Sequence, residues 1–407
     1  GEGATSKIFK VEDMKTNKIY AAKIFKKDSS CFKMEEECLT LLKNKGVKNI
    51  VNLIDSRQGT IKYKNAAANK QYLILEFAEK KDLSRYIKIV EKGFVESQAQ
   101  LLFTKILDIV KEIHKNHICH RDLKAANILL DNNFNPIICD FGFSTYNSNR
   151  LTEGCGSPYY AAPEIPRENE IKRYDGFQVD VFALGVLLFN IVYGRHGFTE
   201  PYQTDKAYKY ILMNKPDKFW QQQTLNPPPS TEFKDLYFAM IDPDPKKRPE
   251  ITQIENYKWI EDFKKKSDED KKGIELQLYE EFCERENKIR LSTQKKIKRD
   301  NNNVNCSCGN KDTGEEEEGH FSDKTTLIRL CNDWKCLEFF IEIEGYLKPF
   351  QFMNDFYKKI EDEYEKNNED ENENEKDKDY NCEIIFVDDN LHFKAIFTID
   401  QDDIGES

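Results

Sequence analysis

The sequence predicts an α+β protein in which a strand-rich lobe precedes a helical lobe. Near the N-terminus, residues 19–25 and 72–77 alternate side chains in the manner of strands. Residues 99–114 repeat apolar side chains every three or four positions, which predicts an amphipathic helix. Residues 179–192 are almost wholly apolar but too short to span a bilayer, so we expect a helix in the core of the second lobe.

The length and composition indicate an intracellular globular protein with polar appendages. The 407 residues are 39% hydrophobic and 33% charged, which excludes a fibre or a wholly disordered chain. The 11 cysteines are odd in number and scattered, so we expect reduced thiols and a cytoplasmic or nuclear location. We find no secretory signal and expect no transmembrane segment.

The charge differs sharply between the two parts of the chain. Residues 1–260 contain 39 Lys and Arg against 33 Asp and Glu, whereas the remaining 147 residues contain 23 against 40. The two parts are therefore expected to do different work.

The composition predicts three successive units. Residues 1–263 form the two-lobed unit. Residues 264–323 are expected to hold a charged helix at 273–297 that docks on the first unit, and a disordered linker from residue 301 to 319. Residues 324–400 are expected to be a small α/β unit. Its predicted elements are a strand at 326–330, a helix bearing Met353, Phe356, Tyr357, Ile360 and Tyr364, an acidic loop at 361–379, and a hairpin of 383–387 with 391–399.

Five short motifs occur in order within the first 164 residues, and each is weak when taken alone. They are Gly1-Glu2-Gly3-Ala4-Thr5-Ser6-Lys7-Ile8, Ala21-Ala22-Lys23 with the later run Glu35-Glu36-Glu37, His120-Arg121-Asp122-Leu123-Lys124-Ala125-Ala126-Asn127, Asp140-Phe141-Gly142, and Ala162-Pro163-Glu164. In this order and at these separations, the sequence resembles the eukaryotic protein kinase family. It is most similar to the serine/threonine branch, among the calcium/calmodulin-dependent and AMP-activated kinase-like members.

The resemblance implies the two-lobed protein kinase fold, with a β-rich N-lobe and a helical C-lobe, followed by the small α/β unit. Because the chain opens on Gly1, we expect the N-lobe to lack its first strand. The resemblance also implies ATP and Mg²⁺ as cofactors and proteins with Ser or Thr acceptors as substrates. Lysine at position 124 and the segment around Ser157 are typical of that branch. No nucleic acid is expected as a partner, and the partner of the C-terminal unit is unknown.

Phosphoryl transfer requires charge neutralisation and alignment of the acceptor hydroxyl, and the motif residues supply both. The resemblance assigns Asp122 as the base and Lys124 to the transferring phosphate. Lys23 would hold the α and β phosphates, paired with a carboxylate from the following helix. We expect that carboxylate to be Glu37, with Glu36 as the alternative, and the other glutamates to lie on a solvated face.

Asn127 and Asp140 would hold Mg²⁺, because amide and carboxylate oxygens suit this ion. The resemblance implies a further set of nucleotide contacts, in which Ala22, Ile8 and Leu129 enclose adenine. The full set of predicted nucleotide contacts is Gly1, Gly3, Ser6, Ile8, Ala21, Lys23, Glu76, Ala78, Asp82 and Leu129. Supporting structural matches are the pair Glu164 and Arg248, Asp180 as an anchor of the catalytic loop, and a stack of Leu41, His120 and Phe141. The alternative function is a pseudokinase scaffold that binds partners without catalysis.

The activation segment carries one departure from the family pattern. Glu153 stands thirteen residues after Asp140, where similar kinases place a threonine that is phosphorylated. We expect its carboxylate to pair with Arg121 as a built-in, weaker substitute for phosphate. The alternative is that Glu153 is an exposed charge and that Thr152 is the phosphosite.

The remaining cysteines and histidines give weaker signals. A zinc site is conceivable at Cys306, Cys308, His320, Cys331 and Cys336, but the irregular spacing favours free thiols. Cys139 and Cys155 flank catalytic motifs and are candidates for redox sensitivity, although a buried thiol is usually inert. The C-terminal unit faintly resembles the regulatory domains that follow some kinase domains. Its acidic charge argues against binding to acidic lipids.

Overall fold

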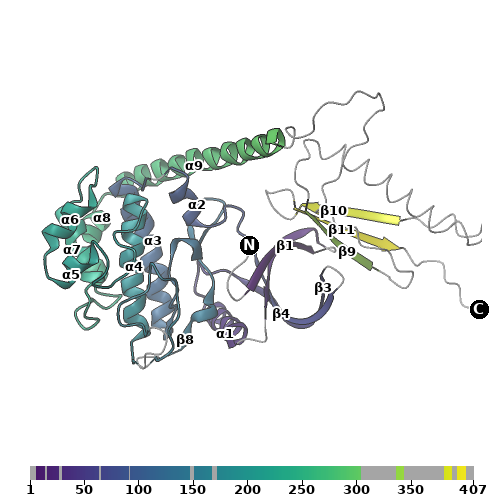
Figure 1. Cartoon of the computed structure of the whole chain (residues 1–407), viewed down its shortest axis with the longest axis horizontal. Coiled ribbons are helices and arrows are strands. Elements are labelled where there is room, and N and C mark those ends of the chain that lie inside the picture. Colours follow the sequence, from purple (N-terminus) through teal and green to yellow (C-terminus); the bar gives the residue numbers. More distant parts are fainter. Residues whose placement is uncertain are drawn as a thin grey trace, which may run out of the picture.

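A strand-rich lobe and a helical lobe lie side by side in the computed structural model, as the sequence predicts (Figure 1). The structure describes residues 6–13, 16–26, 30–63, 66–90, 92–146, 151–166, 172–303, 336–342, 380–386 and 392–399.

The N-terminal lobe is a four-stranded antiparallel sheet with the order β1-β2-β4-β3. Its strands are β1 (Ser6–Asp13), β2 (Lys18–Phe25), β3 (Leu53–Tyr63) and β4 (Ala66–Glu76). The predicted strands at 19–25 and 72–77 coincide with β2 and with the end of β4, whose aromatic and β-branched side chains favour pleated backbone. Helix α1 (Ser30–Asn44) follows β2 and is the only long helix described in this lobe.

The C-terminal lobe is mostly helical. Its helices are α2 (Leu83–Lys88), α3 (Glu96–Lys115), α4 (Gly176–Tyr193), α5 (Tyr208–Leu212), α6 (Pro216–Gln223), α7 (Thr231–Met240) and α8 (Lys258–Lys264). Two short antiparallel ladders flank residues 120–127 and 140–142, which lie between α3 and α4. The ladders are β5 (Ile118–Cys119) with β8 (Thr145–Tyr146), and β6 (Ile128–Leu130) with β7 (Pro136–Ile138). The 3₁₀ turns are η1 (Ala125–Asn127), η2 (Phe141–Phe143) and η3 (Ile254–Asn256).

Helix α4 is the core helix that residues 179–192 predict. Among the described residues it is the one helix long and apolar enough to cross a membrane, yet 78% of it is buried inside the protein. The Asp175 side chain caps its start by accepting a hydrogen bond from the Phe177 amide at 2.9 Å. Gly194 ends it at φ +71°, where a Cβ would lie 2.5 Å from the backbone of Lys92. Glycine is therefore required at this end of the helix.

Helix α9 (Asp268–Asn303) packs against the helical lobe, as the sequence suggested, and it is longer at both ends than the predicted 273–297. Phe282 is fully buried and stacks on Phe134 with ring centroids 4.9 Å apart. The fully buried Arg285 donates hydrogen bonds to backbone carbonyl oxygens at the end of α2 and just beyond it. In Figure 1, α9 runs along the top of the molecule above α2. Residues 301–303, which were predicted to belong to the linker, are therefore still part of this helix.

The C-terminal strands form a sheet of their own, with the order β10-β11-β9. These strands are β9 (Cys336–Glu342), β10 (Tyr380–Phe386) and β11 (His392–Ile399). The predicted hairpin is confirmed as the antiparallel pair β10 and β11, whereas β9 was not predicted. The predicted strand 326–330, the helix at 353–364 and the acidic loop at 361–379 lie outside the described residues, as do most of the residues of the conceivable zinc site.

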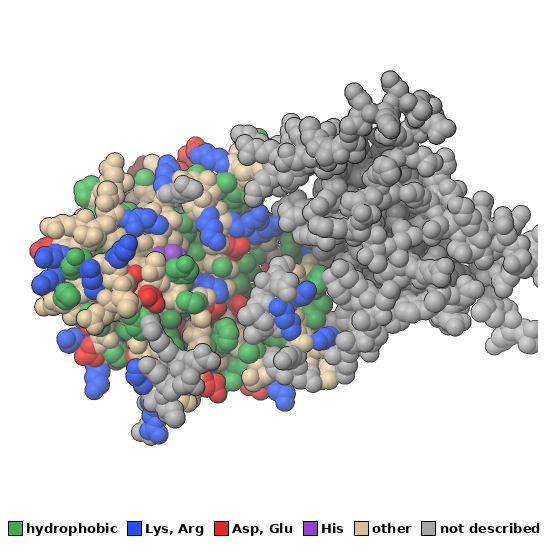
Figure 2. Space-filling view, in the orientation of Figure 1, with side chains coloured by type: hydrophobic (Ala, Val, Ile, Leu, Met, Phe, Trp, Pro, Cys, Tyr) green, Lys and Arg blue, Asp and Glu red, His purple; other side chains and the backbone are tan. Residues whose placement is uncertain are grey.

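Charged side chains of both signs are mixed on the face of the helical lobe that Figure 2 shows. On the visible face of the described residues, Lys and Arg side chains are scattered among apolar and acidic ones (Figure 2). The basic excess of residues 1–260 is therefore not gathered into a single stripe on this face.

Candidate active site

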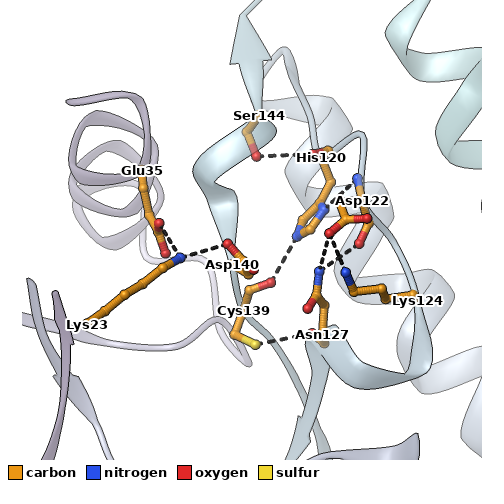
Figure 3. A network of polar contacts seen from close by, with 9 residues as sticks. All are labelled: Lys23, Glu35, His120, Asp122, Lys124, Asn127, Cys139, Asp140 and Ser144. Atoms are coloured by element: carbon orange, nitrogen blue, oxygen red, sulfur yellow. Dashed lines mark hydrogen bonds and ion pairs between the residues drawn. The ribbon is translucent and has the colours of Figure 1, made fainter. Parts of the chain in front are cut away.

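Lys23 lies between two carboxylates that come from different parts of the chain. Strand β2 carries it, and its Nζ lies 2.5 Å from Glu35 Oε2 on α1 and 2.7 Å from Asp140 Oδ1 (Figure 3). The side chains of Lys23 and Glu35 are 3% and 0% exposed, whereas that of Asp140 is 39% exposed. The lysine predicted to hold phosphates is thus fixed on a strand, and one of its partners remains accessible.

The prediction that Glu37 pairs with Lys23 is wrong, because Glu35 takes that place. Residues two apart on a helix point about 200° away from each other, and Glu37 is exposed on the outer side of α1. The alternative, Glu36, accepts a hydrogen bond from the Ser56 hydroxyl.

The helical period would have identified the correct carboxylate. Glu35 follows the buried Phe32 by three positions and precedes the buried Leu39 by four, so it lies on the apolar face of α1. The prediction relied on counting loop lengths instead. Leu39, one turn from Glu35, is fully buried, whereas Leu41 is partly buried and packs against the core.

The charges of this cluster are set by burial and by mutual attraction. Burial alone would lower the pKa of Lys23, but the carboxylates of Glu35 and Asp140 raise its pKa above the ordinary value. Complete burial raises the pKa of Glu35, and the nearby ammonium group opposes that rise. Burial would also raise the pKa of Asp140, but Lys23 outweighs it and lowers that pKa. At neutral pH, Lys23 is therefore a cation and Asp140 an anion.

The Asp122 carboxylate accepts hydrogen bonds from three side chains. Its Oδ2 accepts from Lys124 Nζ at 2.7 Å and from Asn127 Nδ2 at 3.0 Å (Figure 3). Its Oδ1 accepts from the Ser157 hydroxyl at 2.8 Å, and Lys124 Nζ also contacts that hydroxyl at 2.7 Å. Ser157 therefore contacts both Asp122 and Lys124.

A buried aspartate on α4 anchors the backbone of the catalytic loop, residues 120–127. Asp180 accepts hydrogen bonds from the backbone amides of His120 and Arg121, both at 2.7 Å, and its Oδ2 lies 2.9 Å from His114 Nε2. Arg121 has a φ of +63°, a left-handed conformation that a non-glycine residue adopts only when its surroundings enforce it. The anchoring role predicted for Asp180 is confirmed.

The Asp140-Phe141-Gly142 motif is packed with its phenylalanine inward. The Phe141 ring is fully buried, and its centroid lies 4.9 Å from that of His120. Asp140 itself has a φ of +68°, so its backbone is also held in the left-handed region. The buried ion pair of Glu164 with Arg248 is likewise confirmed, with two contacts of 2.6 and 2.8 Å. The inward Phe141 keeps Asp140 directed towards Lys23.

The structure brings several of the predicted nucleotide contacts to the same face of the sheet. Ile8 pairs with Lys23 across β1 and β2, and paired residues share a face, as do Lys23 and Ala21 two positions apart. Ala22 faces the opposite side and is buried in the core, so it does not enclose adenine beside Ile8. Ser6 begins β1 and is buried.

The remaining predicted contacts lie where the two lobes join. Glu76 ends β4, and Ala78 lies in the connection that follows it. Asp82 precedes α2 and forms a β-bridge with Leu129 on β6. Gly1 and Gly3 lie outside the described residues.

Asn127 and Asp140 retain oxygen atoms suited to a divalent ion. The Asn127 amide uses its nitrogen to donate to Asp122, and within the described residues no donor contacts its Oδ1. The Asp140 carboxylate uses Oδ1 for Lys23 and leaves Oδ2 without a described hydrogen bond. One amide oxygen and one anionic carboxylate match the oxygen ligands that Mg²⁺ prefers.

The predicted ion pair of Glu153 with Arg121 is not formed. The Glu153 side chain is exposed, and the Arg121 guanidinium instead donates to the Phe143 carbonyl at 2.6 Å and to the Tyr174 hydroxyl at 3.0 Å. Burial raises the pKa values of both Cys139 and Cys155, so these groups are thiols at neutral pH and poor nucleophiles. The cysteines whose side chains the structure describes are free, namely Cys31, Cys38, Cys119, Cys139, Cys155 and Cys283.

Comparisons with known proteins agree with this geometry. The family model of the protein kinase domain matches residues 1–260, and the chain belongs to this family. It is 33% identical to the human SNF-related serine/threonine-protein kinase over 230 residues, which cover 56% of this chain and 27% of that protein. It is 30% identical over 275 residues to CBL-interacting protein kinase 11 of Oryza sativa subsp. japonica, covering 64% and 49% of the two chains. It is 33% identical over 211 residues to the serine/threonine-protein kinase SIK1 of Mus musculus, covering 51% and 25%. The chain thus spans between a quarter and a half of the length of these relatives.

Proposed function

We propose that this chain transfers the γ-phosphoryl group of ATP to serine and threonine hydroxyls of proteins. The observation that carries the proposal is that Lys23 and Asp140, which are 117 residues apart, converge in one site with Asp122 and Asn127 of a single loop. Membership of the protein kinase domain family and the names of the relatives support the same reaction.

Asp122 is the proposed base. In the structure its Oδ1 accepts a hydrogen bond from the hydroxyl of Ser157, which is the group that a serine substrate presents. An acceptor hydroxyl bound there would be oriented towards the phosphate and would pass its proton to the carboxylate. Lys124 contacts the same carboxylate and the same hydroxyl, which supports a role for its ammonium in stabilising negative charge on the transferring group.

Lys23 is proposed to hold the α and β phosphates of ATP. Its rotamer is fixed by Glu35, so the cation loses little further freedom when the nucleotide binds. Asn127 Oδ1 and Asp140 Oδ2 would hold Mg²⁺, which neutralises phosphate charge when it is bound.

The test uses residues 1–407 with γ-labelled ATP, Mg²⁺ and an array of peptides with Ser, Thr or Tyr acceptors. Labelling of Ser and Thr peptides is expected, with at least a 100-fold lower rate for Asp122→Asn and no incorporation for Asp140→Ala. Glu37→Gln serves as a control on the exposed face of the same helix that carries Glu35. Incorporation no higher than that of Asp140→Ala would favour the alternative, a scaffold without catalysis, and labelling confined to tyrosine would refute the substrate class.

A further inference from the structure

The catalytic-loop arginine has no acidic partner in the part of the chain that the structure describes. Arg121 Nε donates to the Phe143 carbonyl at 2.6 Å, and Nη1 donates to the Tyr174 hydroxyl at 3.0 Å. Both acceptors are neutral. The guanidinium group is half-buried, and the backbone of Arg121 is held in the left-handed region. Both features require partners that keep the residue in place.

Tyr174 connects that arginine to the activation segment, which we define as residues 140–164. Its hydroxyl accepts from Arg121 and donates to the backbone carbonyl of Glu153 at 2.7 Å. Its own backbone forms a two-bond bridge with Leu151, at 2.9 and 3.0 Å. Tyr174 is only 4% exposed. One tyrosine therefore joins the catalytic loop, the activation segment and the chain that leads into α4.

We propose that Tyr174 is a positioning residue, and that its hydroxyl performs the task that the sequence suggested for the Glu153 carboxylate. The inference rests on the proposed phosphotransfer activity. Arg121 directly precedes Asp122, so the hydrogen bond that fixes the guanidinium also limits the movement of the proposed base.

The chemistry of this connection differs from that of an acidic anchor. Glu153 contributes its backbone carbonyl, which any residue at that position would supply. Burial raises the pKa of Tyr174 well above the ordinary value, so the hydroxyl stays neutral and can accept and donate at once. The activation segment also approaches the catalytic loop closely at Gly156. Its φ is +99°, and a Cβ there would lie 2.8 Å from the Arg121 carbonyl oxygen. The segment is thus seated on Arg121 by contacts that involve no negative charge.

The experiment compares initial rates of peptide phosphorylation for wild type, Tyr174→Phe, Glu153→Ala and Arg121→Met, with Tyr257→Phe as a matched control at the start of α8. Tyr174→Phe is expected to lower kcat about tenfold, a loss equivalent to one hydrogen bond to a charged group, and to leave the KM for ATP within twofold. Glu153→Ala and Tyr257→Phe are expected to leave kcat within twofold. In an Arg121→Met background, adding Tyr174→Phe is expected to cause no further loss, because the hydroxyl acts through the guanidinium.

Melting temperatures of all variants are measured beside the rates. If Tyr174→Phe is unfolded at the assay temperature, Arg121→Met tests the same contact from its other side and is expected to show at least the same tenfold loss. The inference is overturned by a Tyr174→Phe enzyme as fast as wild type, by a Glu153→Ala enzyme as slow as Tyr174→Phe, or by additive losses in the double variant. A wild-type chain that transfers no phosphate would refute the proposed function itself, which is a different result.

Discussion

Replacing Arg285 with methionine is expected to lower the melting temperature of the protein by about 10 °C. The fully buried guanidinium donates to the carbonyl oxygens of Tyr86, Lys92 and Gly93 at 3.0, 3.2 and 2.7 Å, and it lies 3.9 Å from the Phe94 ring centroid. Methionine keeps an apolar stem but leaves these three acceptors without their donor.

Each buried carbonyl that loses its partner costs about 1–3 kcal/mol, and relief of the burial of a charge offsets part of the sum. We therefore expect a net loss of about 3–5 kcal/mol. At about 2–4 °C for each kcal/mol in a domain of this size, that loss corresponds to roughly 10 °C.

The assay is thermal unfolding followed by circular dichroism at constant pH and ionic strength. Arg290→Met is the matched control, because Arg290 is exposed on the same helix and its one hydrogen bond within the described residues is to Asn287, at 3.4 Å. It is expected to change the melting temperature by less than 2 °C. An Arg285→Met protein that melts within 2 °C of wild type would refute the conclusion that α9 is packed into the helical lobe.

Three further predictions concern the catalytic cluster and the fold around it. Glu35→Gln is expected to lower kcat/KM at least tenfold in the peptide assay, because the Lys23 rotamer loses its ion pair, whereas an equal loss in Glu37→Gln would contradict the observed pairing. Gly156→Ala is expected to lower kcat at least tenfold, because the new Cβ meets the catalytic loop, and equal rates for this variant and wild type would count against the close approach. Gly273→Ala is the contrasting variant, because its Cβ meets nothing within 4 Å, and it should stabilise α9 by about 0.5–1 kcal/mol. Burial would raise the pKa of Asp205, but hydrogen bonds from backbone amides and from a hydroxyl outweigh it and lower that pKa. The ionised carboxylate therefore stabilises the protein above the unfolded pKa of about 3.9, and this contribution is lost as pH falls through the lower folded pKa. The difference in urea-unfolding free energy between wild type and Asp205→Asn should accordingly be about 1–3 kcal/mol at pH 7 and shrink towards pH 3, and a constant difference would show that the charge of Asp205 is not involved.

Most of the site was predictable because its chemistry is concentrated in short, contiguous motifs. Asp122, Lys124 and Asn127 lie within six residues, so their proximity is a local property of one loop. Lys23 and Asp140 are 117 residues apart, and only the resemblance to a family implied that they share a site. The hairpin β10 and β11 was also predictable, since alternating side chains flank a turn sequence.

The predictions from sequence were wrong where one of two neighbouring residues of similar chemistry had to be chosen for a role. Glu35 and Glu37 have the same chemistry, and only the direction of the helix face separates them. Ala21 and Ala22 differ in the same way on β2, because successive residues of a strand point to opposite sides. The partner of Arg121 was missed because Tyr174 lies 53 residues away and outside every motif.

The sequence alone determined which functional groups this protein has, because a lysine, two aspartates and an asparagine in ordered motifs specify one chemistry wherever they meet. It also determined the order of strands and helices, since the periodicity of apolar side chains is a local property. Only the tertiary structure decided which carboxylate faces Lys23, which hydroxyl fixes Arg121, and how α9 is held by Arg285. Those choices depend on the distance and direction between segments remote in the chain, and a linear pattern does not contain them.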